Sequence, residues 1–282
     1  MRRQRVSGNA SAPRPQLRSI RFRAHEADTY PFDTPVIKTL LGDELTFDGP
    51  VTVLAGENGS GKSTLLEAIA CAIDAVAVGS QEVSRDASLE AGRSLAALMT
   101  PVWSPVKRTH RGFFLRAEDF FGYALRIDRT RAELKAQRAE LMADETISAV
   151  SRAYALQPIA RELDDLERFY GEGLDTHSHG EAFLELFRQR LQPGGVYLLD
   201  EPEAPLSPTR QLTLLSMMLA VVREQGAQII MATHSPIMMA FPGATLLHLS
   251  GGTIEPASFD DIEHISVMRS FLSDPEAYLR HL

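Results

Sequence analysis

The chain has 282 residues, of which 44% are hydrophobic and 23% charged, a balance ordinary for a folded protein with a sizeable core. Its single cysteine, Cys71, excludes an internal disulfide framework. The sequence has no run of 18 apolar residues, so it does not predict a membrane-spanning helix. The arginine-rich start has no apolar segment of signal-peptide length, so we expect a cytoplasmic protein.

The net charge of −8 is spread unevenly along the chain. Residues 1–23 hold seven arginines and no acid, and such an arm either binds nucleic acid or a membrane surface or stays a solvated tail. Residues 1–15 are rich in Arg, Ser, Pro and Gly, which predicts a disordered basic tail. We expect residues 16–282 to form a single domain.

The first predicted elements are strands. Residues 17–24 alternate apolar and polar side chains, and residues 44–56 read as two strands separated by a turn at Asp48-Gly49-Pro50. The second of these, 51–54, is apolar on both faces, as in a strand covered on both sides. A helix is expected over 63–78.

Residues 80–185 have a different pattern, of helices with long loops, and we expect them to form an inserted helical subdomain. Within it, 129–145 is a highly charged helix with a narrow apolar stripe, expected to be short and mostly solvated. Residues 183–191 form another amphipathic helix.

Strands then return at 195–200, 227–233 and 244–250, with a helix at 209–225. A strand, helix and strand at this spacing predict a parallel sheet with right-handed crossovers. The fold class is therefore α/β.

One loop carries the strongest chemical signal. The sequence GENGSGKS fits the phosphate-loop pattern G-x-x-x-x-G-K-[ST] and lies between a predicted strand and a predicted helix. Its backbone amides and the helix N-terminus favour a phosphate anion, while the lysine is expected to bridge the β- and γ-phosphates and the serine to bind Mg²⁺. The predicted nucleotide-binding residues are Gly56, Glu57, Asn58, Gly59, Ser60, Gly61, Lys62, Ser63 and Thr64.

A second motif, VYLLDEPEA, is an apolar strand that ends in two acids, which is a Walker B pattern. Asp200 at the strand tip is predicted to hold Mg²⁺, and Glu201 to orient and deprotonate the attacking water.

With these motifs the chain resembles the ABC-class ATPases, over roughly residues 17–250. MATHSP resembles the family's switch-histidine segment, 34 residues past Asp200, and implies that His234 senses the γ-phosphate. APLS resembles the D-loop, with Ser207 where the family usually has aspartate. The resemblance implies a P-loop NTPase fold, with a mostly parallel sheet, an N-terminal antiparallel β-subdomain and a helical lid.

Other family positions depart from the usual residues. HSHGE stands in place of the signature, where only Ser178, Gly180 and Glu181 correspond; a metal site at its two histidines is the rival interpretation. FFLRAEDFF stands in place of the Q-loop, with Arg116 at the glutamine position, and we expect this arginine to contact phosphate or to structure the lid. Tyr30 or Phe32 lies about where the family stacks adenine.

The resemblance implies ATP and Mg²⁺ as ligands and an ATP-driven head-to-tail homodimer in which the signature of one subunit meets the γ-phosphate of the other. Closest in character are stand-alone bacterial AAA-family ATPases of the ABC type. Two alternatives stay open. One is the energising subunit of a membrane transporter; the other is a nucleotide-gated module with slow hydrolysis, acting on nucleic acid or in defence with a partner protein.

Overall fold

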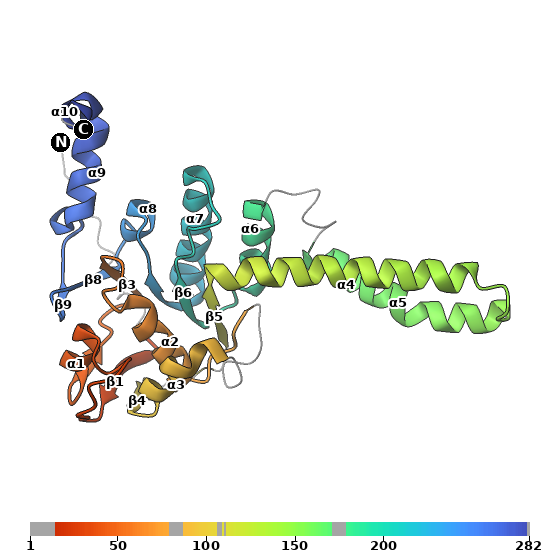
Figure 1. Ribbon diagram of the computed structural model, residues 1–282, viewed down its shortest axis with the longest axis horizontal. Coiled ribbons are helices and arrows are strands. Elements are labelled where there is room, and N and C mark those ends of the chain that lie inside the picture. Colours follow the sequence, from red (N-terminus) through yellow and green to blue (C-terminus); the bar gives the residue numbers. More distant parts are fainter. Residues whose placement is uncertain (1–14, 79–86, 106–108, 110, 171–178, 281–282) are drawn as a thin grey trace, which may run out of the picture.

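The computed structural model describes residues 15–78, 87–105, 109, 111–170 and 179–280. Two sheets and their covering helices form a body from which one long helical hairpin extends (Figure 1). The predicted tail, residues 1–15, lies almost wholly outside the described residues. No helix of the described chain is both long and apolar enough to cross a membrane.

The larger sheet has six strands in the order β5-β6-β7-β3-β8-β9. All neighbours in it run parallel except β8 and β9. The sequence prediction of an α/β fold with a mostly parallel sheet is confirmed. The strands are β3 (Val51–Gly56), β5 (Gly112–Arg116), β6 (Val196–Asp200), β7 (Gln228–Ala232), β8 (Thr245–Ser250) and β9 (Thr253–Pro256).

The smaller sheet is antiparallel, in the order β2-β1-β4, and contains the predicted N-terminal strands. The two strands expected over 44–56 both form, but they belong to different sheets, because β2 pairs with β1 whereas β3 pairs with β7 and β8. The strands are β1 (Leu17–Phe22), β2 (Glu44–Thr46) and β4 (Met99–Trp103).

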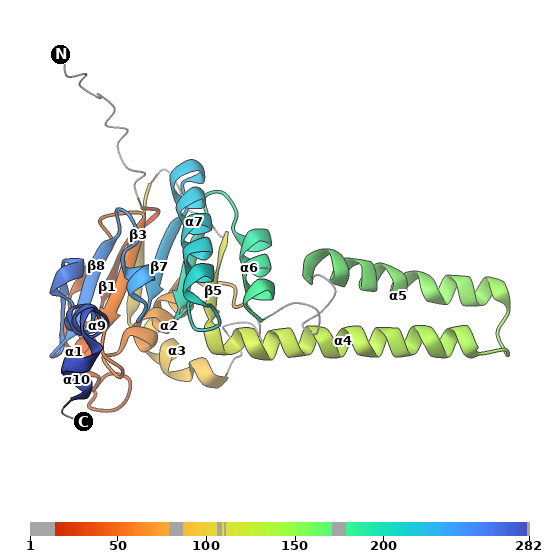
Figure 2. The same ribbon diagram turned by 90° about the horizontal axis from the view of Figure 1, so that it is seen from above.

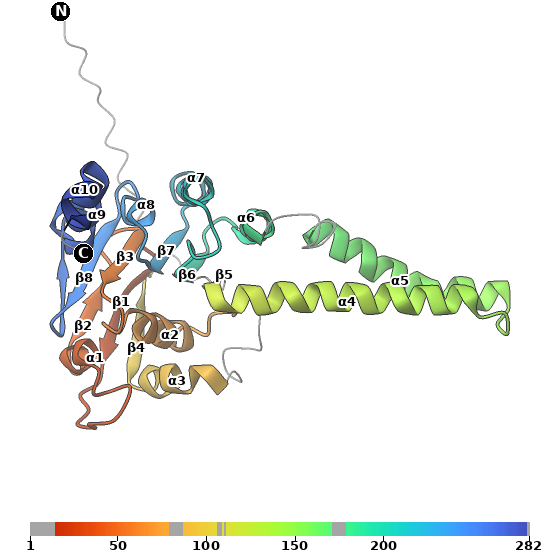
Figure 3. The same cartoon turned by 45° about the horizontal axis from the view of Figure 1, so that its top comes forward.

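Helices cover both faces of the larger sheet (Figure 3). Alternate strand residues enter two cores, so that Val53 and Leu199 face one helical layer while Leu54 and Leu198 face the other. One core holds α6 (His179–Arg190), α7 (Pro208–Gln225) and α8 (Pro236–Met239). The other holds the smaller sheet with α1 (Pro35–Leu40), α2 (Lys62–Ala72) and α3 (Glu90–Ala96); short 3₁₀ turns occur at η1 (Ala87–Leu89) and η2 (Phe259–Asp261).

The helical hairpin consists of α4 (Ala117–Ala143) and α5 (Ala149–Tyr170), which run side by side away from the sheets (Figure 2). The helix expected at 129–145 is mostly exposed, as predicted, but it is not short, because it is the second half of the 27-residue α4. Leu134 and Ile159 are buried, and Arg131 is buried beside Asp128. The apolar stripe is narrow because it faces only one partner helix.

Two other expectations need correction. The segment 80–185 is not wholly helical, because β4 and β5 lie within it and β5 is part of the larger sheet. The inserted helical subdomain stays a prediction. Because β4 and β5 are strands, it can include only the residues between β5 and β6. The helix expected over 63–78 ends at Ala72, since Asp74 has a left-handed φ of 54°.

Candidate nucleotide-binding site

The phosphate loop joins β3 to α2, and two of its glycines are required by geometry. A Cβ on Gly56, whose φ is 151°, would lie 2.4 Å from the Leu249 carbonyl oxygen. A Cβ on Gly61, whose φ is 94°, would lie 2.7 Å from Val36. Any larger residue at either position would displace the loop from β8 or from α1. The glycines therefore set how closely the loop packs on its neighbours.

Lys62 begins α2 and its ammonium is held by the loop itself. It donates to the carbonyl oxygens of Gly56, at 2.9 Å, and Glu57, at 2.8 Å, and lies 3.4 Å from Ser60 Oγ. Burial lowers the pKa of Lys62, and the nearby carboxylates of Glu201 and Asp200 oppose that shift. The charge is thus placed at the mouth of the loop, where the α2 N-terminus also favours an anion.

Asp200 ends β6 and lies directly beside the loop. Ser63 Oγ donates to Asp200 Oδ1 over 3.1 Å. Burial raises the pKa of Asp200 to about 7, although the Ser63 hydrogen bond lowers it. A buried carboxylate and a hydroxyl are the hard oxygen donors that Mg²⁺ prefers, so this pair fits the predicted metal. Such a cation would relieve the cost of burying the Asp200 charge.

Glu201 follows Asp200 with an unusual backbone. Its φ is 48°, a strained value for a residue other than glycine, and its amide donates to the Ala232 carbonyl over 2.9 Å. The carboxylate lies 3.9 Å from His234 Nε2. Burial lowers the pKa of His234, and the charge of Lys62 lowers it further. The strained turn therefore places the predicted base beside the predicted γ-phosphate sensor.

Glu203 is a site residue that the sequence analysis missed. Its Oε1 accepts hydrogen bonds from Thr233 Oγ1 at 2.6 Å, the His234 amide at 2.8 Å and the Ser235 amide at 3.0 Å. Ser235 in turn caps α8 and donates to Gln211 Oε1. One carboxylate thus fixes the histidine loop to the segment after β6. The sequence DEPEA shows that this residue is acidic, but it does not show that the carboxylate bonds to a loop 30 residues away.

Arg116 is positioned by acids rather than left free to reach a phosphate. Its guanidinium bonds to both carboxylate oxygens of Asp119, to Glu67 and to Ser88. Although burial opposes the charge, the Asp119 hydrogen bond and the surrounding carboxylates hold the pKa of Arg116 above its usual value. Arg116 pairs in register with Asp200 on β6, so it lies at the right strand end, but its described contacts are structural.

The signature region is described only in part, because Ser178 lies outside the described residues. Gly180 is buried near the start of α6, and a Cβ there would lie 3.0 Å from Arg210 and 3.2 Å from the Pro205 carbonyl oxygen. Arg210 also pairs with Glu181 at 2.9 Å. Gly180 thus packs on the segment that resembles the D-loop. Its proposed role toward a second subunit stays a prediction.

Of the two candidates for stacking adenine, Tyr30 contacts a predicted nucleotide-binding residue. Its hydroxyl is 3.2 Å from Thr64 Oγ1, and the side chain is largely exposed. Phe32 instead packs on the core and meets His25 edge to face. The geometry favours Tyr30.

Comparisons with known proteins agree with this arrangement. A family model described as an AAA domain matches residues 37–96, which include the phosphate loop. A second, described as "AAA domain, putative AbiEii toxin, Type IV TA system", matches residues 182–240, which include Asp200, Glu201 and His234. The macrolide export ATP-binding/permease protein MacB of Escherichia coli K12 is 23% identical over 218 residues. These matches support the assignment of this chain as an ABC-class P-loop ATPase.

The match to MacB covers 75% of this chain but only 30% of MacB, and the same shares hold for MacB of Shigella sonnei. Among solved structures, a putative metal-chelate type ABC transporter aligns with a TM-score of 0.44 at 15% identity, covering 88% of this chain and 84% of its own. The ATP-binding cassette MJ0796, in a dimeric post-hydrolysis state with ADP and Pi, aligns with a TM-score of 0.42 at 18% identity, covering 78% of this chain and 90% of its own.

The fold brings the predicted groups to one edge of the larger sheet, because β3, β6 and β7 are parallel and end together. Lys62, Ser63, Asp200, Glu201 and His234 all follow the carboxyl ends of these strands or begin the helix after them. No group of three or more His, Cys, Asp or Glu within the described ranges could hold a metal alone. A metal at Asp200 and Ser63 would need phosphate or water oxygens to complete its coordination.

Proposed function

We propose that this protein hydrolyses ATP to ADP and phosphate within a head-to-tail homodimer. The observation that supports it is the contact of three motifs at one sheet edge: Ser63 bonds to Asp200, and Glu201 lies 3.9 Å from His234. The motifs are 137 and 33 residues apart in sequence. Phosphoryl transfer depends mainly on positioning and electrostatic stabilisation, and this edge offers both.

Each residue has a distinct role in the proposed reaction. Lys62 and the loop amides bind the triphosphate, and Mg²⁺ held at Asp200 and Ser63 would neutralise charge on the phosphates. Glu201 accepts a proton from water as its oxygen attacks the γ-phosphorus in line with the bond to ADP. His234 is neutral near pH 7 because its pKa is lowered, and it hydrogen-bonds the γ-phosphate without adding a net charge.

The dimer completes this site. Ser178 and Gly180 of a second copy contact the γ-phosphate, so the bound nucleotide becomes part of the interface and stabilises the closed form by mass action. Hydrolysis then removes the phosphate that bridges the two copies. The packing of Gly180 against Arg210 supports a fixed position for Gly180 itself.

The test compares two variants. Glu201→Gln removes the base and keeps ATP bound, so light scattering with excess ATP and Mg²⁺ should give a dimer and phosphate release should fall at least about a hundredfold. Lys62→Ala should abolish binding of labelled ATP and should stay monomeric. A Glu201→Gln form that is monomeric with excess ATP contradicts the dimer, and unchanged ATP binding by Lys62→Ala contradicts the loop assignment.

A second candidate function follows from the MacB match. MacB is described as an export ATP-binding/permease protein, so this chain could energise a separate membrane component. Arg116 at the glutamine position, bonded to Asp119 and Glu67, argues against the usual coupling through that loop. Co-purification with an integral membrane protein would favour this candidate over the stand-alone dimer.

A further inference from the structure

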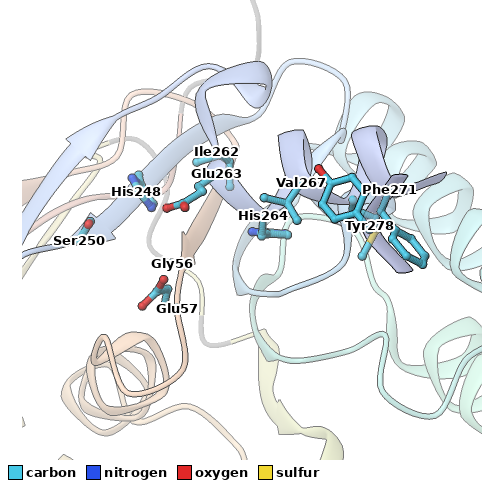
Figure 4. A pocket seen from close by; sticks show the side chains of 11 residues that line it. Gly56, Glu57, His248, Ser250, Ile262, Glu263, His264, Val267, Phe271 and Tyr278 are labelled. Atoms are coloured by element: carbon cyan, nitrogen blue, oxygen red, sulfur yellow. The ribbon is translucent and has the colours of Figure 1, made fainter. Parts of the chain in front are cut away.

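A cavity of about 510 Å³ lies between the phosphate loop and the C-terminal helices (Figure 4). Gly56 and Glu57 line one end of it, and Phe271 and Tyr278 line the other. The helices are α9 (Glu263–Ser273) and α10 (Pro275–Leu279). The volume is in the range of cavities that accept a ligand or a protein side-chain cluster. We call it the C-terminal pocket.

The start of α9 is anchored close to the proposed catalytic residues. Ile262 and Ile265 are buried in the same core as α7 and α8. The His264 ring lies 6.5 Å from the His234 ring, between their centres, and its Nε2 is buried without a hydrogen-bond partner. The wall of the pocket is therefore attached directly beside the γ-phosphate sensor.

The rest of α9 and α10 leaves an apolar face uncovered, although Phe271 and Tyr278 pack edge to face with ring centres 5.7 Å apart. Six large apolar side chains on these helices are 37–70% exposed. Since a large side chain has roughly 200 Å² of surface, they expose on the order of 600 Å². They are Val267, Met268, Phe271, Leu272, Tyr278 and Leu279, and we call them the C-terminal apolar face.

This area indicates an interface. Monomeric proteins seldom expose apolar patches larger than a few hundred Å², whereas each partner in a stable interface buries about 800 Å². The C-terminal apolar face supplies most of that area, and it adjoins Glu57 of the phosphate loop through the pocket. Because this surface adjoins the proposed nucleotide site, a partner that covers it could bind together with the nucleotide.

We propose that the C-terminal apolar face and pocket are part of the contact with a second copy of this chain. The inference rests on the proposed function, in which a second copy contacts the γ-phosphate held by the phosphate loop. Gly56 and Glu57 of that loop also line the C-terminal pocket, so the pocket adjoins the proposed dimer contact. Burial of the C-terminal apolar face would then stabilise an interface whose centre is polar. Because the pocket touches the phosphate loop, dimer formation would also depend on the conformation of that loop.

The test measures dimerisation in the Glu201→Gln background with ATP and Mg²⁺, by sedimentation or light scattering over a range of concentrations. Val267→Asp and Leu272→Asp place a charge on exposed positions of α9, 48% and 70% accessible. Val150→Asp is the matched control, because Val150 is 67% exposed on the distant hairpin. Labelled-ATP binding at low protein concentration and the melting temperature establish that each variant is folded.

Both α9 variants should raise the dimer dissociation constant at least tenfold with ATP affinity of the monomer unchanged, while the Val150→Asp control dimerises like its parent. Dimers as tight as the parent in both α9 variants would overturn the inference and leave the proposed function standing. If Val150→Asp weakened the dimer as much as the α9 variants do, the inference would also be overturned, because the effect of an added charge would then not depend on its position. A parent that never dimerises would refute the inference together with the proposed dimer.

Discussion

The carboxylate of Glu203 gives the sharpest prediction about turnover. Replacing Glu203 with alanine removes the acceptor of three hydrogen bonds, of 2.6, 2.8 and 3.0 Å, from Thr233, His234 and Ser235. Each bond to a carboxylate contributes on the order of 1.5–3 kcal/mol, and leaving partly buried donors unpaired costs a similar amount. Other conformations of the histidine loop would offset part of this loss.

We therefore expect the productive loop geometry to lose about 2–4 kcal/mol, which lowers kcat roughly 30- to 1000-fold. KM should change less than kcat, because Glu203 acts on Lys62 of the phosphate loop only through its charge, as the weakest of three carboxylates. Glu203→Gln keeps the accepting oxygen but loses the charge, and since charged hydrogen bonds are about twice as strong as neutral ones, it should restore much of the rate.

The assay is steady-state phosphate release over a range of ATP concentrations at one protein concentration. Glu224→Ala is the control, as Glu224 is an exposed glutamate near the end of α7. A Glu203→Ala variant with normal kcat, or one that raises KM without lowering kcat, would refute the argument that this carboxylate positions His234. Equal losses in the Gln and Ala variants would show that the charge, and not the accepting oxygen, is what matters.

Three more predictions concern stability. Burial raises the pKa of Asp200 from 3.8 to about 7, so the folded chain loses stability as pH rises through that interval. Asp200→Asn should gain up to about 4 kcal/mol relative to the parent between pH 4 and pH 8 without nucleotide; a difference independent of pH in urea unfolding would contradict this. Gly56→Ala should lower the melting temperature and abolish labelled-ATP binding, since its Cβ would meet the Leu249 carbonyl at 2.4 Å, whereas at Gly59 a Cβ meets nothing within 4 Å. Arg116→Met should cost about 3 kcal/mol in urea unfolding by leaving two partly buried carboxylates unpaired, and an unchanged midpoint would argue against a structural ion pair.

Local sequence was enough to predict the fold class and the loop. The glycine spacing, the lysine and the flanking apolar strand lie within a dozen residues, so their geometry depends on short-range constraints. The acids after β6 and the histidine after β7 could be placed at the same edge because parallel strands end together.

Contacts between distant segments could not be predicted in this way. The helix over 129–145 gives no sign that α5 covers its stripe, and Glu203 gives no sign that it bonds to Thr233. Arg116 was expected at a phosphate or in the lid, but its partner Glu67 comes from α2, 49 residues earlier. The C-terminal helices went unpredicted, because their apolar residues face outwards and serve no core in a single chain.

The hairpin begins without any intervening loop where β5 ends, at Arg116, whose register partner is Asp200. A helix of 27 residues is about 40 Å long at 1.5 Å per residue. A rotation of about 5° at its root would therefore displace its far end by roughly 3–4 Å, given that length. A small rotation at the strand ends, beside the proposed nucleotide site, would therefore become a displacement of several ångströms at the far end of the hairpin.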